Sequence, residues 1–510
     1  MGVASALHRG RVVVAAGVLA GAAFPLAMAP LDWVWCAFAS LAVLFAVAAL
    51  APIRPAMLGA YAFGVGQFGV GVSWVYVSIH DYGGAGVVLS AAVTALFVLF
   101  MALFPLLAVV LGRALAGGPS MRLALTLPAA WVFVEWVRTW LFTGFPWLFA
   151  GYATLETPLS ALVPVVGVLG ASAVVAWTAS LVVWAVVRPG LRSATVVLVM
   201  ALSLGGILVA LTDRAWTQPA GEPVRVALLQ GNFSQDIKWD PDQLDRIQQR
   251  YATMTAESAG SDVIIWPETA IPARLDRVEG YVHAVARDVR QAGGALVLGI
   301  PVREWAPGGG YLYNSIIALS DEKDAYHKRH LVPYGEYVPF RDVFGRSLDF
   351  LGAPMADYSR GPWPEPLKLG DGLTAGATIC YEVAYPRAVR RTAADVDFLI
   401  NVSNDAWFGD SLAPAQHLQK ARMRAAEVGR WMARSTNTGI TAVIDHHGRV
   451  VERAPQFEVA KVDARVERRH GATPYARAGD GPVLVLLFAV LFGAGIASLR
   501  RERSASPWNR

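Results

Sequence analysis

The chain has 510 residues, of which 55% are apolar and 16% charged, whereas charged residues make up about a quarter of an ordinary soluble protein. This composition excludes both a disordered chain and a wholly soluble enzyme. Residues 213–480 carry 66 of the 83 charged side chains, residues 1–212 carry 12, and residues 481–510 carry 5. We therefore predict a membrane domain over 1–212, a soluble domain over 213–480, and a C-terminal membrane helix with a basic tail over 481–510.

The net charge of +5 does not indicate nucleic-acid binding. The soluble block has a net charge of −2, and the two apolar flanks together have +7. The basic character of the chain therefore belongs to the membrane flanks, where it reports on topology rather than on a partner.

Eight apolar segments are candidates for helices that cross the ~30 Å hydrocarbon core of a bilayer. They lie at Val12–Ala29, Val34–Leu50, Met57–Ile79, Gly86–Leu111, Leu123–Val137, Leu159–Val187, Ala194–Leu211 and Val483–Leu499. The fifth is the shortest and carries Glu135 near its end. A cleaved signal peptide is the alternative for the first segment, but six further spans follow it without a soluble stretch, which favours a membrane span.

Basic residues cluster on one side of these predicted spans. Arginines occur near both termini and in the loops on the same side, such as Arg54, Arg113 and Arg192, whereas the opposite short loops hold Asp32 and Asp81. Positive charge stays on the cytoplasmic side, so we predict cytoplasmic termini and a soluble domain that faces outward.

Two stretches on the outward side are rich in aromatic and polar residues: residues 73–82 and 143–147. They indicate either an aromatic belt at the membrane interface or the wall of a lipid-access groove. Glu135 and Arg138 are three residues apart on one predicted helix, which favours an ion pair, although an acid inside a membrane is also a candidate functional group.

The soluble block alternates short β-rich runs with helical stretches, which predicts an α/β layered sandwich. The predicted strands are Val224–Gln230, Asp262–Trp266, Ala295–Gly299, Tyr311–Leu319, Gly376–Cys380, Phe398–Val402 and Thr441–Ile444. The predicted helices are Asp242–Ser258, Val278–Gln291 and Pro414–Arg434.

Cysteine usage points to a nucleophile. Cys36 lies in a predicted membrane span and Cys380 in the outward domain, so the two cannot form a disulfide. A single unpaired thiol in an oxidising compartment is a candidate reactive group. Cys380 also stands where an apolar strand ends and polar residues begin, which is the usual place for catalytic groups in an α/β sheet.

Two other segments supply groups that a reactive thiol needs. The strand ending in Ile265-Trp266-Pro267 is followed by Glu268, and the segment His327-Lys328-Arg329-His330 offers a lysine, with Glu336 further on. A carboxylate can accept the thiol proton, and a cation can stabilise negative charge on sulfur or on a substrate oxygen.

The contexts WPET, HKRHLVPYGEYVP and ICYE resemble the nitrilase, or carbon–nitrogen hydrolase, superfamily over about Val224–Asp463. The resemblance implies a four-layer α-β-β-α sandwich with Cys380 as nucleophile, Glu268 as general base and Lys328 as the oxyanion-stabilising group. It also implies that Glu336 assists. A thioacyl enzyme would then react with water in a hydrolase or with an amine in an acyltransferase.

The whole chain resembles the apolipoprotein N-acyltransferase family, including YVSIHDYG at Tyr76–Gly83, Gln230-Gly231-Asn232 and the stretch Ser403–Gly409. This resemblance implies a bacterial inner-membrane enzyme with a periplasmic catalytic domain. The implied acyl donor is a phospholipid, usually phosphatidylethanolamine, and the acceptor is the α-amine of a diacylglyceryl-cysteine on an apolipoprotein. Trp239, Asn314, Tyr381 and Glu382 would position substrate or support the triad. We expect no cofactor, metal or nucleic acid, and a monomer.

Other segments give weaker predictions. Phe350 and Leu351 lie in a mixed apolar and charged loop that is either ordinary packing or a hydrophobic lid over the thioester. The arginines at 422, 424, 430 and 434 recur along the predicted helix 414–434, which favours pairing with acids over a lipid-phosphate site. The pair His446-His447 lacks chelating geometry for a metal.

Two alternative functions remain open from the residues. A membrane-tethered amidase would use the same triad. A transporter or receptor would use the outer domain only to bind ligand, but the spans lack the paired charges and broken helices typical of transport sites.

Overall fold

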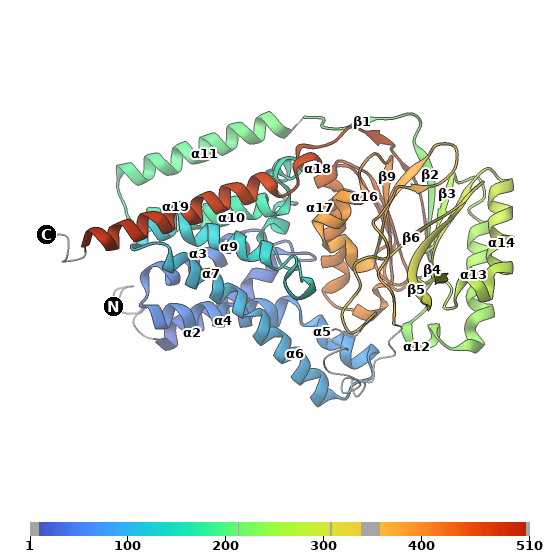
Figure 1. Cartoon of the computed structure of the whole chain (residues 1–510), viewed down its shortest axis with the longest axis horizontal. Helices are drawn as coiled ribbons and strands as arrows, with labels where there is room; N and C mark the ends of the chain where they lie inside the picture. The colour runs from blue at the N-terminus through green and yellow to red at the C-terminus, as the bar shows by residue number, and fades with distance from the viewer. Residues whose placement is uncertain (1–9, 213, 307–308, 338–356, 506–510) are drawn as a thin grey trace. The chain divides into compact units, whose positions relative to one another are not determined.

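The computed structural model describes residues 10–212, 214–306, 309–337 and 357–505, which form two compact units (Figure 1). The helical unit comprises Met1–Trp74, Ala91–Arg214 and Ala478–Arg510. The α/β unit comprises Val75–Ser90 and Ala215–Arg477. The short segment Val75–Ser90 thus packs with the α/β unit, although apolar helices precede and follow it in the sequence.

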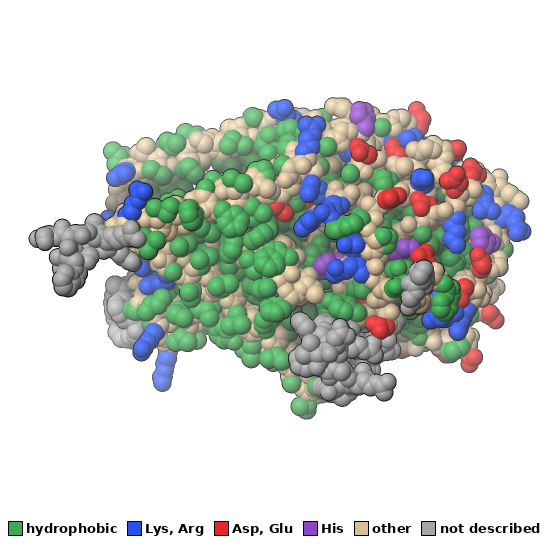
Figure 2. Space-filling model, viewed as in Figure 1, with side chains coloured by type: hydrophobic (Ala, Val, Ile, Leu, Met, Phe, Trp, Pro, Cys, Tyr) green, Lys and Arg blue, Asp and Glu red, His purple; other side chains and the backbone are tan. Residues whose placement is uncertain are grey.

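The helical unit is built from apolar helices. Its longer helices are α2 (Gly10–Ala23), α3 (Trp35–Leu50), α4 (Ile53–Gly71), α7 (Leu103–Ala114), α9 (Leu127–Val137), α10 (Val163–Val187), α11 (Leu191–Thr212) and α19 (Gly481–Ala505), and α6 (Val87–Met101) begins in the α/β unit. Hydrophobic side chains cover the visible face of this unit, whereas charged side chains gather over the α/β unit (Figure 2). None of the apolar window of α11 is buried, as expected of a helix that contacts lipid tails.

Among the described residues, five helical segments are long and apolar enough to cross a membrane, and a sixth arises if a bent pair forms one span. The five are Gly10–Ala27, Val87–Ala114, Pro158–Val187, Leu191–Thr212 and Gly481–Arg500. The bent pair corresponds to the predicted span Met57–Ile79, which breaks after Gly71 with an angle of 52°. The predicted spans near residues 34–50 and 123–137 form shorter helices, so the expected count of eight is not confirmed.

The α/β unit contains two six-stranded sheets. One has the order β13-β2-β3-β4-β5-β6 and the other β12-β11-β10-β9-β8-β7. The first sheet comprises β2 (Val224–Gln230), β3 (Val263–Ile265), β4 (Ala295–Ala306), β5 (Gly309–Leu319), β6 (Lys323–His327) and β13 (Ala460–Val466). The second comprises β7 (Leu367–Lys368), β8 (Thr374–Ile379), β9 (Phe398–Ser403), β10 (Met432–Thr436), β11 (Ala442–Ile444) and β12 (Val450–Arg453). A small ribbon pairs β1 (Gln218–Pro219) with β14 (Arg469–His470).

The α/β unit has four layers of helices and sheets, and an apolar core lies between each pair of neighbouring layers. Inward-facing residues of the two sheets, such as Leu228 and Ile400, form the central core. The opposite face of the first sheet packs against α13 (Leu244–Ala256) and α14 (Leu275–Gln291). The second sheet packs against α16 (Pro386–Thr392) and α17 (Ala413–Val428). The strands between the helix layers are buried on both faces, which explains their continuous apolar runs and confirms the expected α-β-β-α sandwich (Figure 1).

The predicted helix Pro414–Arg434 is wrong at its C-terminal end. Helix α17 stops at Val428, and Gly429 has a φ of 64°, in the left-handed region that terminates helices. The chain then enters β10, which pairs in parallel with β9. Arg434 therefore lies on a buried strand rather than on the helix that carries Arg422 and Arg424.

Candidate functional site

Three strand ends bring the predicted catalytic residues into one unit. Glu268 follows β3 and Lys328 follows β6 in the first sheet, whereas Cys380 follows β8 in the second. Because the two sheets pack face to face, residues that leave their strands at neighbouring ends can approach one another across the layers. Glu268 and Lys328 are buried, and Cys380 is half-buried.

A buried hydrogen-bond network joins Glu268, Lys328 and Glu336. Lys328 Nζ lies 2.9 Å from Glu336 Oε1 and 3.5 Å from Glu268 Oε1. Asn314 on β5 bridges the two carboxylates, since its Nδ2 donates to Glu268 Oε1 at 2.7 Å and to Glu336 Oε1 at 2.8 Å. The structure thus brings together four residues that the sequence separates by up to 68 positions. One lysine between two acids neutralises one of the two negative charges, and the hydrogen bonds from Asn314 help to stabilise the carboxylate pair in the interior.

Backbone amides complete the coordination of both acids. Asn404 N donates to Glu268 Oε2 at 2.8 Å, and Val332 N donates to Glu336 Oε2 at 2.8 Å. Close packing fixes the main chain as well, because a Cβ at Gly299 would lie only 2.5 Å from Glu268 Cα. Glycine at this position of β4 therefore lets the segment after β3 approach the sheet.

The backbone of Cys380 adopts a left-handed conformation, and a buried histidine contacts its carbonyl oxygen. Its φ is 50°, a left-handed conformation that costs a non-glycine residue about 1–2 kcal/mol. His417 on α17 places Nε2 3.1 Å from the Cys380 carbonyl oxygen, which only a donor can satisfy. His417 Nδ1 lies 2.9 Å from Asp405 Oδ1. The strained turn at the thiol is therefore held by a contact from a different element.

Asp405 is the centre of a second buried network, which sequence reasoning missed. Its Oδ2 accepts from Arg434 Nη2 at 2.7 Å, and its Oδ1 accepts from Ser403 Oγ at 2.7 Å. The ligand-type atoms of Cys380, Asp405 and His417 all lie within 4.8 Å of one another, a spacing that could hold a metal. The ion pair with Arg434 and the two contacts of the His417 ring account for Asp405 and His417 without one, so this cluster fits a positioning network better.

Electrostatics keep the Cys380 thiol protonated at rest. Burial raises the pKa of the thiol, and the negative charges of Glu268 and Asp405 raise it further. Lys328 and a hydrogen bond from Ser403 act in the opposite direction but do not cancel the rise. A nucleophilic role for this thiol would therefore require a proton acceptor, and a carboxylate such as that of Glu268 has the right chemistry.

Lys328 stays charged in spite of its burial. Desolvation lowers the pKa of its amine, but the charges of Glu336 and Glu268 outweigh burial and raise it above the ordinary value. A second lysine behaves differently: burial lowers the pKa of Lys238 to about 8, although the charge of Glu268 opposes this shift. Lys238 Nζ lies 3.3 Å from the Glu268 carbonyl oxygen, and its neighbour Trp239 is 51% exposed.

Glu382 is a buried anchor for the segments that carry Lys328 and Cys380. Burial raises the pKa of its carboxyl group, and the hydrogen bonds it accepts oppose this rise. It accepts bonds from Arg329 N (2.8 Å) and His330 N (2.9 Å) on Oε1, and from Ile379 N (2.9 Å) and the Tyr326 hydroxyl (2.8 Å) on Oε2. One carboxylate thus ties the segment after β6 to the end of β8. Tyr381, beside it, packs edge-on against Tyr385 with ring centroids 5.1 Å apart.

Two segments singled out in the sequence meet within the α/β unit. Ser78 Oγ donates to the Trp407 carbonyl oxygen at 2.8 Å. A Cβ at Gly409 would lie 3.2 Å from the Tyr82 hydroxyl oxygen. The aromatic stretch near residues 76–83 therefore packs on the turn that follows Asp405. This contact favours a role in the site for that stretch over an aromatic belt alone.

Phe350 and Leu351 lie outside the described residues. The arginines at 422, 424 and 430 are described, and their printed partners are groups other than the predicted catalytic residues. Arg424 forms a buried ion pair with Glu427 at 2.9 Å, as expected from their spacing on α17. Arg422 Nε donates to the Gly448 carbonyl oxygen at 2.7 Å, and Arg430 Nε to that of Val396 at 2.8 Å. These arginines hold the protein interior together, which argues against a lipid-phosphate role for them.

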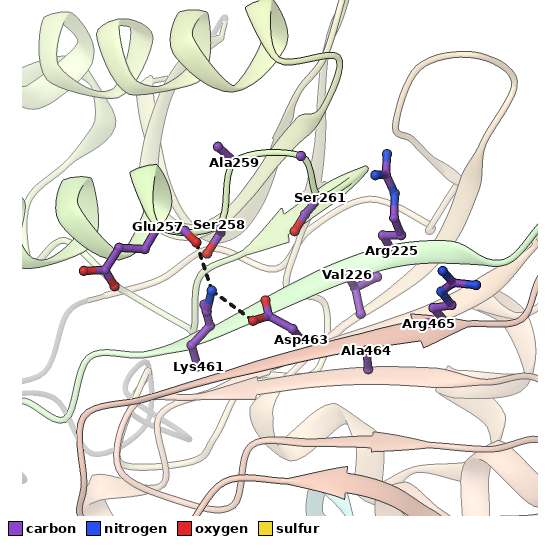
Figure 3. Close-up of a pocket in the computed structure, with 11 residues that line it drawn as sticks. Arg225, Val226, Glu257, Ser258, Ala259, Ser261, Lys461, Asp463, Ala464 and Arg465 are labelled. Carbon is purple, nitrogen blue, oxygen red and sulfur yellow. Dashed lines mark hydrogen bonds and ion pairs between the residues drawn. The ribbon is translucent and has the colours of Figure 1, made fainter.

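A surface depression of about 380 Å³ lies at the edge of the first sheet (Figure 3). Two of its basic side chains already have acidic partners. Lys461 Nζ lies 2.9 Å from Asp463 Oδ2 and 3.0 Å from the Glu257 carbonyl oxygen, and Arg225 Nη2 lies 2.6 Å from Asp262 Oδ1. None of the predicted catalytic residues lines it, so this depression is not a candidate active site.

Comparison with known proteins identifies both parts of the chain. Residues 20–181 match the family model of the apolipoprotein N-acyltransferase N-terminal domain, and residues 225–470 match that of carbon-nitrogen hydrolase. Among solved structures, Nit3 of Saccharomyces cerevisiae, a member of the nitrilase superfamily, is 18% identical with a TM-score of 0.37. That match covers 50% of this chain and 93% of Nit3.

Relatives with curated names match almost the entire chain. The apolipoprotein N-acyltransferase of Methylococcus capsulatus is 44% identical over 493 residues, covering 95% of this chain and 96% of the relative. That of Azotobacter vinelandii is 42% identical, covering 95% of both chains. Identity of this extent spans the helical segments as well as the α/β unit. The chain therefore belongs to the apolipoprotein N-acyltransferase family and is an acyltransferase.

Proposed function

We propose that this protein transfers a fatty acyl chain from a membrane phospholipid to the α-amine of the N-terminal diacylglyceryl-cysteine of apolipoproteins. The observation that carries the proposal is the near full-length identity to enzymes of that name. The buried network of Glu268, Lys328 and Glu336 beside the half-buried Cys380 supplies the groups that the chemistry needs. Phosphatidylethanolamine is the proposed donor, and the proposed active form is a monomer.

In the first half-reaction, Cys380 Sγ attacks the ester carbonyl of the donor while Glu268 accepts the thiol proton. The carbonyl oxygen becomes an oxyanion, which the Lys328 ammonium stabilises at low cost because it is already charged and fixed. Collapse of the tetrahedral intermediate breaks the ester bond. Glu268 returns the proton to the departing lysophospholipid oxygen, and the acyl chain remains on sulfur as a thioester.

In the second half-reaction, the acceptor amine attacks the thioester carbonyl and Glu268 accepts a proton from the nitrogen. The C–S bond then breaks, the sulfur recovers its proton, and the product is an amide. Glu336 and Asn314 act by positioning: both contact the network through hydrogen bonds shorter than 3 Å, which fixes the charge opposite the reacting carbonyl. Trp239 and Tyr381 are proposed to contact substrate.

An experiment with labelled substrates tests this function. The purified full-length protein is incubated with acyl-labelled phosphatidylethanolamine and a diacylated lipopeptide, and Cys380→Ala and Cys380→Ser variants are compared with the wild type. We expect acyl label on wild-type Cys380 and then on the lipopeptide, with both lost in the variants. Release of the label as free fatty acid without transfer would favour an amidase-like hydrolase. Absence of any covalent label would contradict both.

The proposed topology is eight membrane spans in a bacterial inner membrane, with cytoplasmic termini and a periplasmic α/β unit. The distribution of arginines between the loops supports it. Labelling of single cysteines tests it, in a chain with Cys36 and Cys380 replaced by Ala. A membrane-impermeant maleimide should label Asp371→Cys in intact spheroplasts but Arg192→Cys only after lysis. The reverse pattern would contradict the proposed orientation.

A further inference from the structure

A group of arginines surrounds an exposed tryptophan on the α/β unit. This group, the Trp363 patch, consists of Arg329 after β6, Arg360 and Trp363 in the segment before β7, and Arg387, Arg390 and Arg391 on α16. The guanidinium carbon of Arg329 lies 3.6 Å from the Trp363 ring centroid, and that of Arg391 lies 4.0 Å from it. Trp363 remains 59% exposed, so the ring gathers two cations at the surface.

The arginines of this patch repel one another, and the charge of Glu382 opposes this repulsion at Arg329. Among the described residues, none of its five arginines forms a salt bridge; the hydrogen bonds of Arg329 and Arg390 go to the carbonyl oxygens of Gly361 and Ala476. Burial lowers the pKa of Arg391, and the charges of Arg387, Arg390 and Arg329 lower it further. The same holds for Arg329, whose pKa is lowered by burial and by Arg360. Mutual repulsion of this kind is relieved when an anion binds.

Arginine and tryptophan together fit one class of anion well. Guanidinium groups bind phosphate oxygens through paired, charge-assisted hydrogen bonds. Tryptophan favours the head-group region of a bilayer, because its ring is apolar and its N–H is polar. The α/β unit also lies, in the sequence, between two candidate spans, since α11 ends at Thr212 and α19 begins at Gly481. A lipid phosphate is therefore always near this unit, unlike a nucleic acid.

We propose that the Trp363 patch binds the phosphate of a net-anionic phospholipid head group, at a surface separate from the acyl-donor carbonyl. Arg329 connects this surface to the site. Its side chain contacts Trp363, and its backbone N–H donates to Glu382 at 2.8 Å, one residue after Lys328. A lipid held at the patch thus steadies the segment that positions the lysine. This last role rests on the proposed function, whereas lipid binding itself does not.

Lipid binding by the full-length protein tests the proposal. Affinity for phosphatidylglycerol is measured by native mass spectrometry in an uncharged detergent, with phosphatidylcholine as the zwitterionic comparison. Because each arginine near an anionic lipid adds to binding, Arg387→Gln/Arg391→Gln should weaken phosphatidylglycerol binding by about tenfold to thirtyfold. Trp363→Leu should weaken it by about threefold through the lost cation–π contacts. The matched control Arg453→Gln/Arg465→Gln removes two exposed arginines elsewhere and should stay within about twofold.

Three results would overturn the proposal: unchanged phosphatidylglycerol binding by the patch variant, an equal loss in the control variant, or an equal loss of phosphatidylcholine binding. Full displacement of the lipid by millimolar inorganic phosphate would assign the patch to a small anion instead. Cys380→Ala separates this proposal from the proposed function, since it should lose the thioester but keep the lipid. A wild type that binds phosphatidylglycerol without forming a thioester would contradict only the proposed function.

Discussion

The helical unit and the α/β unit bury ionisable side chains in different ways. In the helical unit, Glu135 accepts from Trp131 Nε1 at 2.9 Å and from Ala150 N at 2.8 Å, and Arg138 donates to the Trp147 carbonyl oxygen. The guanidinium of Arg138 also faces the rings of Phe68 and Phe149. The two side chains thus have separate hydrogen-bond partners, although the charge of Arg138 still acts on Glu135.

In the α/β unit, by contrast, buried charges face one another directly. Lys328 forms ion pairs with both Glu268 and Glu336, and Arg434 forms one with Asp405. Neutral partners fix a charged group in place, whereas opposed charges also make the ionisation of one group depend on the others. Such dependence suits proton transfer. The contrast predicts that removing a charge has a large chemical effect in the α/β unit and a small one in the helical unit.

The largest effect is expected for Glu268→Gln. Loss of the general base should slow thioester formation at least a hundredfold. The same change removes a negative charge that raises the pKa of the Cys380 thiol, so alkylation of Cys380 should begin at a lower pH than in the wild type. Acyl labelling measures the rate of thioester formation, and iodoacetamide alkylation across pH 6–10 measures the pH at which Cys380 becomes reactive. A common fall of both rates would contradict these assignments, because it would indicate only a disrupted site.

Glu382→Gln should be the next most damaging change. Its carboxylate accepts three backbone N–H bonds and one hydroxyl bond, and an amide nitrogen turned toward those N–H groups leaves at least one donor unsatisfied. We expect a loss of about 2–4 kcal/mol in the free energy of unfolding and a fall of at least tenfold in thioester formation. Thermal unfolding and acyl labelling provide the readouts. Wild-type stability with wild-type labelling would show that the anchor is dispensable.

A smaller effect is expected at His417, whose ring contacts the Cys380 carbonyl oxygen. His417→Leu removes the donor that holds the strained turn, and we expect thioester formation to fall about five- to tenfold. His417→Gln retains an N–H donor and should recover part of the rate. If the leucine and glutamine variants are equally slow, the hydrogen bond to the carbonyl is not the reason for the loss.

The smallest effect should come from Glu135→Gln in the helical unit. Glutamine keeps a side-chain oxygen for the Trp131 and Ala150 donors, and Arg138 keeps its hydrogen bond to the Trp147 carbonyl oxygen. Acyl transfer should stay within about twofold of the wild type. Glu268→Gln serves as the matched charge removal in the other unit. A Glu135 variant as slow as that one would contradict the comparison between the units.

Much of the fold could be predicted because runs of apolar residues in the sequence mark the buried strands. Strand β2 has the predicted bounds Val224–Gln230, and β3, β5, β8 and β9 deviate by at most two residues at either end. These strands are apolar on both faces, so their runs are continuous and end sharply at polar residues. Edge strands such as β6 and β12 were missed, because they are short and half-exposed. The strand β10 was hidden in an apparent helix because only three residues, of which Gly429 is left-handed, separate α17 from β10.

Local contexts predicted Glu268, Lys328 and Cys380, and the family resemblance added Asn314, Glu336 and Glu382, whose contacts the structure describes. Lys238 and His417 were not predicted, since each acts through contacts with residues far away in the sequence. Asp405 lay within a recognised stretch, yet its partner Arg434 was assigned to a helix. Hydrogen-bond networks across two sheets depend on layer packing, which no window of sequence contains.

By itself, the sequence determined that apolar helices flank one charged domain, and that a thiol, an acid and a lysine each follow a strand. These features are local, because hydrophobic periodicity and strand ends are set by neighbouring residues. Only the tertiary structure decided that one lysine lies between two acids, that a histidine contacts the Cys380 backbone, and that five arginines gather around Trp363. Each of these depends on distances between segments that only the packing of sheets and helices sets.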